Sequence, residues 1–81
     1  MRYRKKPVVI DAIRWTGENR DEVEAWSGGE IECIGHVAVV PTLEGEMRGD
    51  VGDWLIRGVQ GEYYPCKDEI FLATYEPAEL T

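Results

Sequence analysis

Short apolar stretches separated by turn-forming residues are the feature that most limits how this chain can fold. The apolar runs at residues 8–10, 37–40 and 54–56 are each three or four residues long, and glycine-containing turns recur between such runs. Short strands joined by tight turns pair in antiparallel sheets, whereas parallel pairing needs a crossover of a dozen or more residues. No strand–helix–strand repeat is present in the sequence, so we expect antiparallel pairing.

Alternation of apolar and polar residues sets the expected strands. We predict strands at residues 6–15, 30–34, 36–41, 54–57, 62–65 and 72–75. A hairpin is expected over residues 41–48, turning at Glu44 and Gly45, and a tight loop follows at residues 49–53. The strands at 54–57 and 62–65 are expected to pair across the turn at 58–61, and residues 66–71 to form one helical turn.

One helix is predicted, over residues 19–26. Asn19 is a preferred N-cap, and Glu22 stands three residues later in the capping-box arrangement. Val23 and Trp26 share a helix face, so we expect both in the core. Residues 27–29, Ser-Gly-Gly, end the helix because glycine tolerates the left-handed backbone that terminates helices.

These elements predict a single α+β domain over residues 1–81. The expected architecture is a small, mostly antiparallel β-sheet of about six strands, rolled or partly barrelled, with one short helix after the first strand. The composition, 43% hydrophobic and 31% charged, is typical of a globular domain. Because a chain of 81 residues buries only a modest core, we expect a homo-oligomer.

The uneven charge distribution argues against some partners. Arg2, Arg4, Lys5 and Lys6 are four of the nine basic residues, and the rest of the chain carries five basic and sixteen acidic residues. Such an acidic body disfavours duplex nucleic acid, which requires a dense basic face. The basic start either contacts a phosphate or an acidic partner, or it protects an edge strand from unwanted pairing.

The apolar runs are also too short for a membrane protein. None approaches the roughly 20 residues that span a bilayer, and residues 8–10 are too few for the apolar part of a signal peptide. We therefore expect no membrane partner and a cytoplasmic location.

Residue types that carry catalysis are sparse. His36 is the single histidine of the chain, and Cys33 and Cys66 lack a metal-binding spacing. The two cysteines are expected as free thiols in a reducing cytoplasm, with a disulfide as the alternative. Asp50 and Asp53 lack the calcium-loop pattern and are expected to brace their own turn. We accordingly predict no catalytic residue, no metal ligand and no cofactor.

A ligand-binding surface has more support. Tyr63 and Tyr64 are adjacent on a strand and therefore point to opposite faces, which favours exposure of one ring. If scarce basic side chains meet an exposed aromatic ring, they form a pocket for a phosphorylated planar ligand. The alternative is that Arg57 and Lys67 pair with nearby carboxylates. The candidate ligand-binding residues are Arg14, Trp15, Arg48, Arg57, Tyr63, Tyr64 and Lys67.

Several blocks of the sequence resemble a widespread family of small phage and prophage accessory proteins of unknown function. The similarity lies in the following blocks: Tyr-Arg-Lys-Lys-Pro-Val-Val-Ile at residues 3–10, Trp-Thr-Gly at 15–17, Gly-Asp-Trp-Leu-Ile-Arg-Gly-Val at 52–59, Gly-Glu at 61–62, Tyr-Pro-Cys-Lys at 64–67, Ile-Phe at 70–71 and Ala-Thr-Tyr-Glu-Pro at 73–77. Residues 18–38 are not diagnostic. The resemblance implies a phage-borne accessory product and supplies no catalytic residue to transfer.

Three functions follow as hypotheses. The first is a non-enzymatic phage accessory protein that binds a host factor, for which an acidic body suits basic or nucleic-acid-binding host proteins. The second is an oligomeric anti-defence protein that sequesters a cyclic-nucleotide-type signal in pockets between subunits. The third, a minor hydrolase that uses the acidic residues, has no catalytic constellation to support it.

Overall fold

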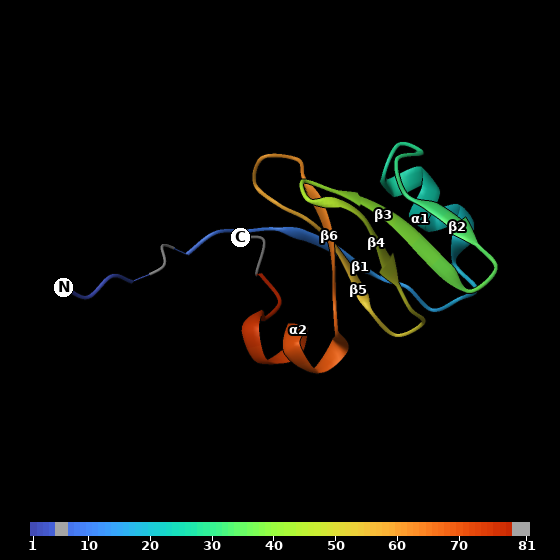
Figure 1. Ribbon diagram of the computed structural model, residues 1–81. Helices are drawn as coiled ribbons and strands as arrows, with labels where there is room; N and C mark the ends of the chain where they lie inside the picture. Colours follow the sequence, from blue (N-terminus) through green and yellow to red (C-terminus); the bar gives the residue numbers. More distant parts are fainter. Residues whose placement is uncertain (5–6, 79–81) are drawn as a thin grey trace.

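The computed structural model describes residues 1–4 and 7–78, which form two antiparallel three-stranded sheets and two helices (Figure 1). The first sheet has the order β1-β5-β6, formed by Asp11–Arg14, Trp54–Arg57 and Tyr63–Cys66. The second has the order β2-β3-β4, formed by Glu32–Ile34, Val37–Thr42 and Gly45–Gly49. Helix α1 (Arg20–Trp26) follows β1, and α2 (Asp68–Thr74) follows β6.

The predicted class, a small α+β domain with antiparallel strands, is confirmed, but the strands do not form one rolled sheet. They are divided between two sheets that do not close into a barrel, and β6 lies against β3 and β4. The hairpin predicted over residues 41–48 is present as β3 and β4, with Thr42 opposite Gly45. The strand at 54–57 and its partner across the 58–61 turn are also present, with Arg57 opposite Tyr63.

Two strand predictions are wrong at the ends of the chain. The first strand was expected at residues 6–15, but β1 is paired only over Asp11–Arg14, opposite Arg57 to Trp54 of β5. Pairing ends there because β5 is followed at once by the turn that begins at Gly58. The strand expected at residues 72–75 is instead the end of α2, which replaces both that strand and the single helical turn expected before it.

Helix α1 spans Arg20–Trp26, close to the predicted 19–26, but its N-terminus uses Asn19 differently. The Asn19 side-chain Oδ1 accepts hydrogen bonds from the Thr16 backbone N–H at 2.9 Å and from the Thr16 hydroxyl at 3.0 Å, not from the helix amides. Its Nδ2 donates to Glu22 Oε1 at 3.0 Å. Asn19 therefore ties the helix to the preceding turn, while the Gly29 N–H closes the other end on the Glu24 carbonyl at 2.8 Å.

The core lies between the two sheets and α1. Trp15, Val23, Ile31, Cys33, Ala38, Val40, Leu55 and Ile56 are fully buried, and Tyr63 is almost so. The Trp15 indole N–H donates to the His36 carbonyl at 2.9 Å, which satisfies the polar atom of the largest core residue and links β1 to the second sheet. Cys33 and Cys66 are both free thiols.

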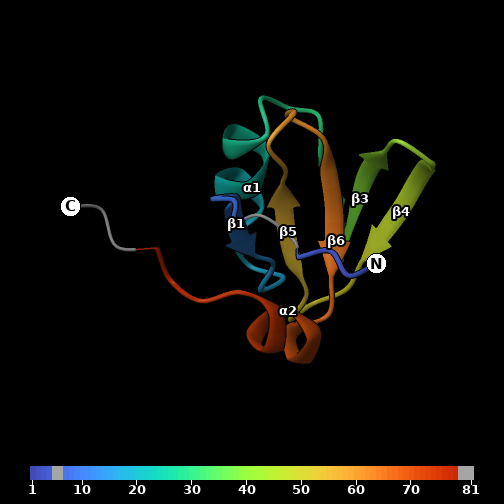
Figure 2. The same cartoon turned by 90° about the vertical axis from the view of Figure 1, so that its left-hand side faces the viewer.

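Helix α2 contributes little to this core. It packs beneath the β1-β5-β6 sheet (Figure 2), mainly through Phe71, whose ring stacks on Trp54 with the centroids 4.1 Å apart. Phe71 also contacts Tyr75, whose hydroxyl lies 3.4 Å from that of Tyr64. No residue of α2 is fully buried. Among residues 1–4 and 7–78, no helix has the length and apolarity needed to cross a membrane.

Candidate functional site

Three of the four predicted basic site residues meet in one charged cluster at the end of β1, β4 and β5. Arg48 Nε donates to Asp50 Oδ1 at 2.6 Å, and Lys67 Nζ donates to Asp50 at 3.4 Å and to Asp53 at 3.1 Å. Arg14 lies 3.8 Å from Asp68. Each of these cations thus faces a carboxylate of the chain itself.

The carboxylates of the charged cluster also hold the backbone. Asp53 Oδ2 accepts the Asp50 backbone N–H at 2.9 Å, so the prediction that these residues brace their own turn is confirmed. Hydrogen bonding from Arg48 lowers the pKa of Asp50. Hydrogen bonding to Asp53 raises the pKa of Lys67, which keeps the ammonium charged. The cluster is therefore mainly a set of internal ion pairs.

Arg57, the fourth predicted cation, lies apart from this cluster at the opposite end of the β1–β5 pair. Its guanidinium sits 4.9 Å from the centre of the Trp26 ring, and Nη1 donates to the Trp26 carbonyl at 3.1 Å. Nη2 donates to Asp11 at 3.4 Å. As the alternative interpretation predicted, Arg57 and Lys67 both pair with carboxylates; Arg57 also fixes the end of α1 on the first sheet.

The predicted aromatic residues divide between the core and the surface. Trp15 is fully buried and Tyr63 is 7% exposed, and the Tyr63 hydroxyl donates to the Ser27 carbonyl at 3.3 Å. Tyr64, next to it on β6, is half-buried and holds Tyr75 through its hydroxyl. Burial, followed by the hydrogen bond with Tyr75, raises the pKa of Tyr64. Only Tyr64 therefore presents a substantial ring surface to solvent.

A hollow of ≈ 220 Å³ lies beside Tyr64, under the β3–β4 hairpin. Met47 is opposite Val40 in the hairpin register, so the two side chains share a sheet face. Val40 is fully buried, yet Met47 is 47% exposed. The turn residue Leu43 is 84% exposed. We call this region the hairpin surface, lined by Thr42, Leu43, Glu44, Met47, Glu62, Tyr63 and Tyr64.

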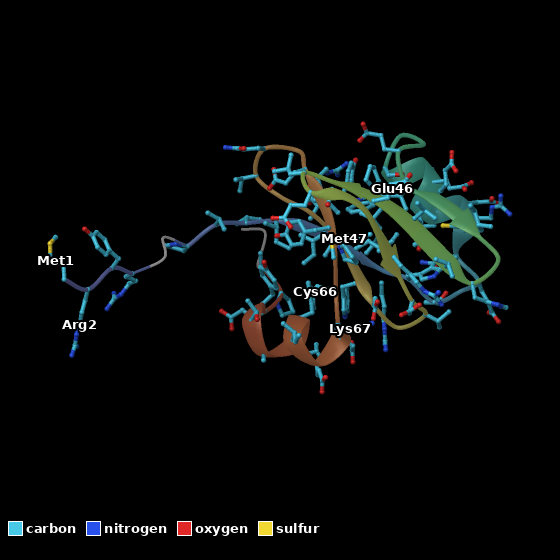
Figure 3. The ribbon with its side chains drawn as sticks, in the orientation of Figure 1. Met1, Arg2, Glu46, Met47, Cys66 and Lys67 are labelled. Atoms are coloured by element: carbon cyan, nitrogen blue, oxygen red, sulfur yellow. The ribbon has the colours of Figure 1, made fainter. Side chains whose placement is uncertain are left out.

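The hairpin surface is rimmed by carboxylates. Glu44 and Glu62 line it, whereas Glu46, next to Met47 on β4 (Figure 3), belongs to the opposite sheet face. None of the described residues that line it is a lysine or an arginine. Tyrosine and methionine are enriched in protein–protein interfaces, and methionine adapts its shape to a partner. The arrangement is thus an apolar contact area inside an acidic rim.

A larger hollow of ≈ 390 Å³ lies between residues 8–10 and α2. Its lining is almost entirely apolar, with the stacked rings of Trp54 and Phe71 at one side. We call it the apolar groove; its lining residues are Val8, Val9, Ile10, Ala12, Trp54, Phe71, Leu72, Tyr75, Glu76, Pro77 and Ala78. The hairpin and α2 project from different sides of the first sheet (Figure 2), so the two surfaces are separate.

The thiols are poorly placed for nucleophilic chemistry. Burial, then the charge of Glu24, raises the pKa of Cys33. Burial, then the charge of Asp53, raises the pKa of Cys66, whereas nucleophilic cysteines have lowered pKa values. His36 is exposed. Within residues 1–4 and 7–78, no group of three or more histidine, cysteine or acidic side chains could hold a metal ion.

Sequence reasoning missed both hollows. The exposed Leu43 and Met47 on either side of the hairpin turn were a signal for the first, since turns are usually polar. The second was hidden because residues 72–75 were predicted as a strand. Comparisons of this chain with protein-family models, with curated proteins and with solved structures find no match, so the function is argued from the geometry.

Proposed function

We propose that this chain is a non-enzymatic phage accessory protein that acts in the cytoplasm of the bacterial host by binding a host protein through the hairpin surface. The observation that carries the proposal is the exposure of Met47 on the same sheet face as the buried Val40. The core face of the second sheet is left open at the hairpin. A partner that covers Leu43 and Met47 gains the burial that the chain itself does not provide.

The charges around the hairpin surface specify the kind of partner. Glu44 and Glu62 line it, and residues 7–78 contain five basic and fifteen acidic residues, a balance of −10. A partner that presents an apolar side chain between lysine or arginine residues complements both the hollow and its rim. Host proteins that bind nucleic acid carry such basic surfaces. The phage assignment rests on the sequence resemblance described above.

Affinity capture from host lysate tests the proposal. The wild-type chain is compared with Leu43→Ser and Met47→Ser, which remove apolar area from the hairpin surface, and with Ile34→Ser. Ile34 is a matched control because it is an exposed apolar residue at the end of β2, outside the hairpin surface. We expect the wild type and Ile34→Ser to recover the same basic host protein. Leu43→Ser and Met47→Ser should each reduce its recovery about tenfold, as loss of a central contact residue does. Equal recovery by all four proteins contradicts the proposal.

Sequestration of a cyclic-nucleotide-type signal has less support. A phosphate ligand would have to displace carboxylates from Arg48 and Lys67, because both side chains are paired within the charged cluster. Calorimetry against a panel of cyclic nucleotides separates the two functions. Heat of binding that disappears in Lys67→Ala would favour the signal-binding function over the protein-binding one.

A further inference from the structure

The apolar groove is uncovered on one long side. Val9 is 72% exposed, Leu72 is 63% exposed, and both line the groove. Residues 7–10 precede β1 and lie beyond the paired strands, and Val8, Val9 and Ile10 form one wall of the groove. Apolar side chains gathered on both walls of a hollow indicate a site that another chain segment fills.

Helix α2 contains no fully buried residue. A helix of seven residues is far below the length that is stable alone, so packing must hold it. That packing rests on the Phe71 ring against Trp54, on the hydrogen bond that the Trp54 indole N–H donates to Asp68 Oδ1 at 2.9 Å, and on the contact between the Tyr64 and Tyr75 hydroxyls. An occupant of the groove would cover Leu72 and complete the burial of α2.

The N-terminal residues carry an aromatic ring and positive charges that complement the groove. Tyr3 is 87% exposed, and Arg2 and Arg4 on either side of it are exposed as well. Figure 3 shows Met1 and Arg2 projecting away from the two sheets. We call residues 1–4 the basic arm. An aromatic ring suits the apolar lining, and two arginines suit a groove in which Glu76 is the one charged lining residue within positions 1–4 and 7–78, on a body that is strongly acidic.

We propose that the occupant of the apolar groove is the basic arm of a second copy of this chain, so that two copies exchange arms in a symmetric dimer. Exchange suits the geometry because residues 8–10, which line the groove, follow the basic arm closely in the sequence, and a two-fold axis near this segment brings each arm to the other copy's groove. The inference goes beyond the proposed function and uses a different surface.

The first test is the mass of the full chain in solution, measured by light scattering and sedimentation at low ionic strength. We expect twice the chain mass of 9.2 kDa. Arg2→Glu/Arg4→Glu removes the charge attraction and should weaken the dimer at least tenfold, as should added salt. Val9→Lys, which places a charge in the lining of the groove, should also weaken the dimer at least tenfold. Val59→Lys is the matched control, because Val59 is a similarly exposed valine (65%) that does not line the groove. A monomeric wild type, or a dimer that neither the arm nor the groove variant weakens, overturns the proposal.

The second test distinguishes exchange between copies from an arm that binds its own groove. Two variants are mixed in a Cys66→Ser background, one with Tyr3→Cys and one with Ala78→Cys, so that a disulfide between these positions must join two chains. We expect the mixed disulfide, and much less of it when Val59→Cys replaces Ala78→Cys. If the mixture does not cross-link but a chain with both Tyr3→Cys and Ala78→Cys closes a disulfide within itself, the arm occupies its own groove and the proposal fails. Because Leu43 and Met47 line a separate surface, failure here leaves the capture experiment unaffected.

Discussion

Replacement of Phe71 by alanine should release helix α2 while leaving the two sheets folded. Truncation of a fully buried phenylalanine costs about 3–5 kcal/mol. Phe71 is only half-buried, although its ring stacks on Trp54 at 4.1 Å between centroids. About half of that cost, ~2 kcal/mol, is therefore expected for the docking of α2. Because α2 contributes no fully buried residue to the core, this loss should appear as local opening rather than global unfolding.

Amide hydrogen exchange measures this directly. The Tyr75 N–H donates to the Phe71 carbonyl at 2.8 Å within α2, whereas the Trp15 N–H donates to the Asp53 carbonyl at 2.9 Å in the body. A loss of ~2 kcal/mol lowers protection of the Tyr75 amide about 30-fold. The Trp15 amide should keep most of its protection. Ile70→Ala is the control on the same helix, because Ile70 is exposed and does not line the groove, and it should change little. The reasoning is refuted if Phe71→Ala leaves the Tyr75 amide as protected as in the wild type.

Three further predictions concern single contacts. Gly17→Ala should lower the free energy of unfolding, measured by urea denaturation, by at least ~1–2 kcal/mol. Gly17 has φ +85°, and an added Cβ would lie 2.9 Å from a Val51 methyl. A denaturation curve identical to that of the wild type would contradict this. Tyr63→Phe should lower the free energy of unfolding by only ~0.5–1 kcal/mol in the same assay. The Ser27 carbonyl that accepts the Tyr63 hydroxyl also accepts the Glu30 backbone N–H at 3.2 Å, so it keeps a hydrogen bond in the variant. A loss above ~2 kcal/mol would contradict this reasoning. The pKa of Asp50 is lowered in the folded state, so its stabilising contribution is present above the unfolded pKa of about 4 and is lost as the pH falls through the folded value. Melting temperatures from pH 6 downward should therefore fall less steeply in Asp50→Asn than in the wild type, and parallel curves would argue against the ion pair.

Residues close together in the sequence were sufficient to predict the central hairpins and α1. The β3–β4 turn and the 58–61 turn are set by glycine-containing sequences between apolar runs, which fix a short connection and hence antiparallel pairing. The Ser-Gly-Gly stop after α1 was also readable, since Gly28 and Gly29 adopt the positive φ values that end helices. These features depend on residues within a few positions of one another.

The ends of the chain depend on distant contacts and were mispredicted for that reason. Residues 72–75 were predicted as a strand, yet the stack of Phe71 on Trp54 favours a helix that brings this ring back onto β5. Residues 8–10 have strong strand propensity, but β5 ends at Arg57 and offers no partner for them. The division into two sheets likewise follows from packing and not from any local pattern.

The candidate site was foreseen in part. Grouping of Arg14, Arg48 and Lys67 was anticipated as a possibility, but neighbouring carboxylates occupy all three. Burial of Trp15 and Tyr63 could not be read from residue type, because aromatic side chains serve cores and binding surfaces equally well. The exposure of Met47 depends on tertiary packing, which no pattern within β4 indicates.

Photo-crosslinking in host lysate tests the central claim, recognition of a host protein at the hairpin surface, most directly. A photoreactive phenylalanine replaces Leu43 in one sample and Ile34 in the other; both sites are exposed, and only Leu43 lies on the hairpin surface. The account predicts one prominent host adduct with a basic protein from position 43 and none from position 34. Equal adducts from both positions, or no adduct from position 43 at a concentration at which the wild type captures a partner, would contradict it.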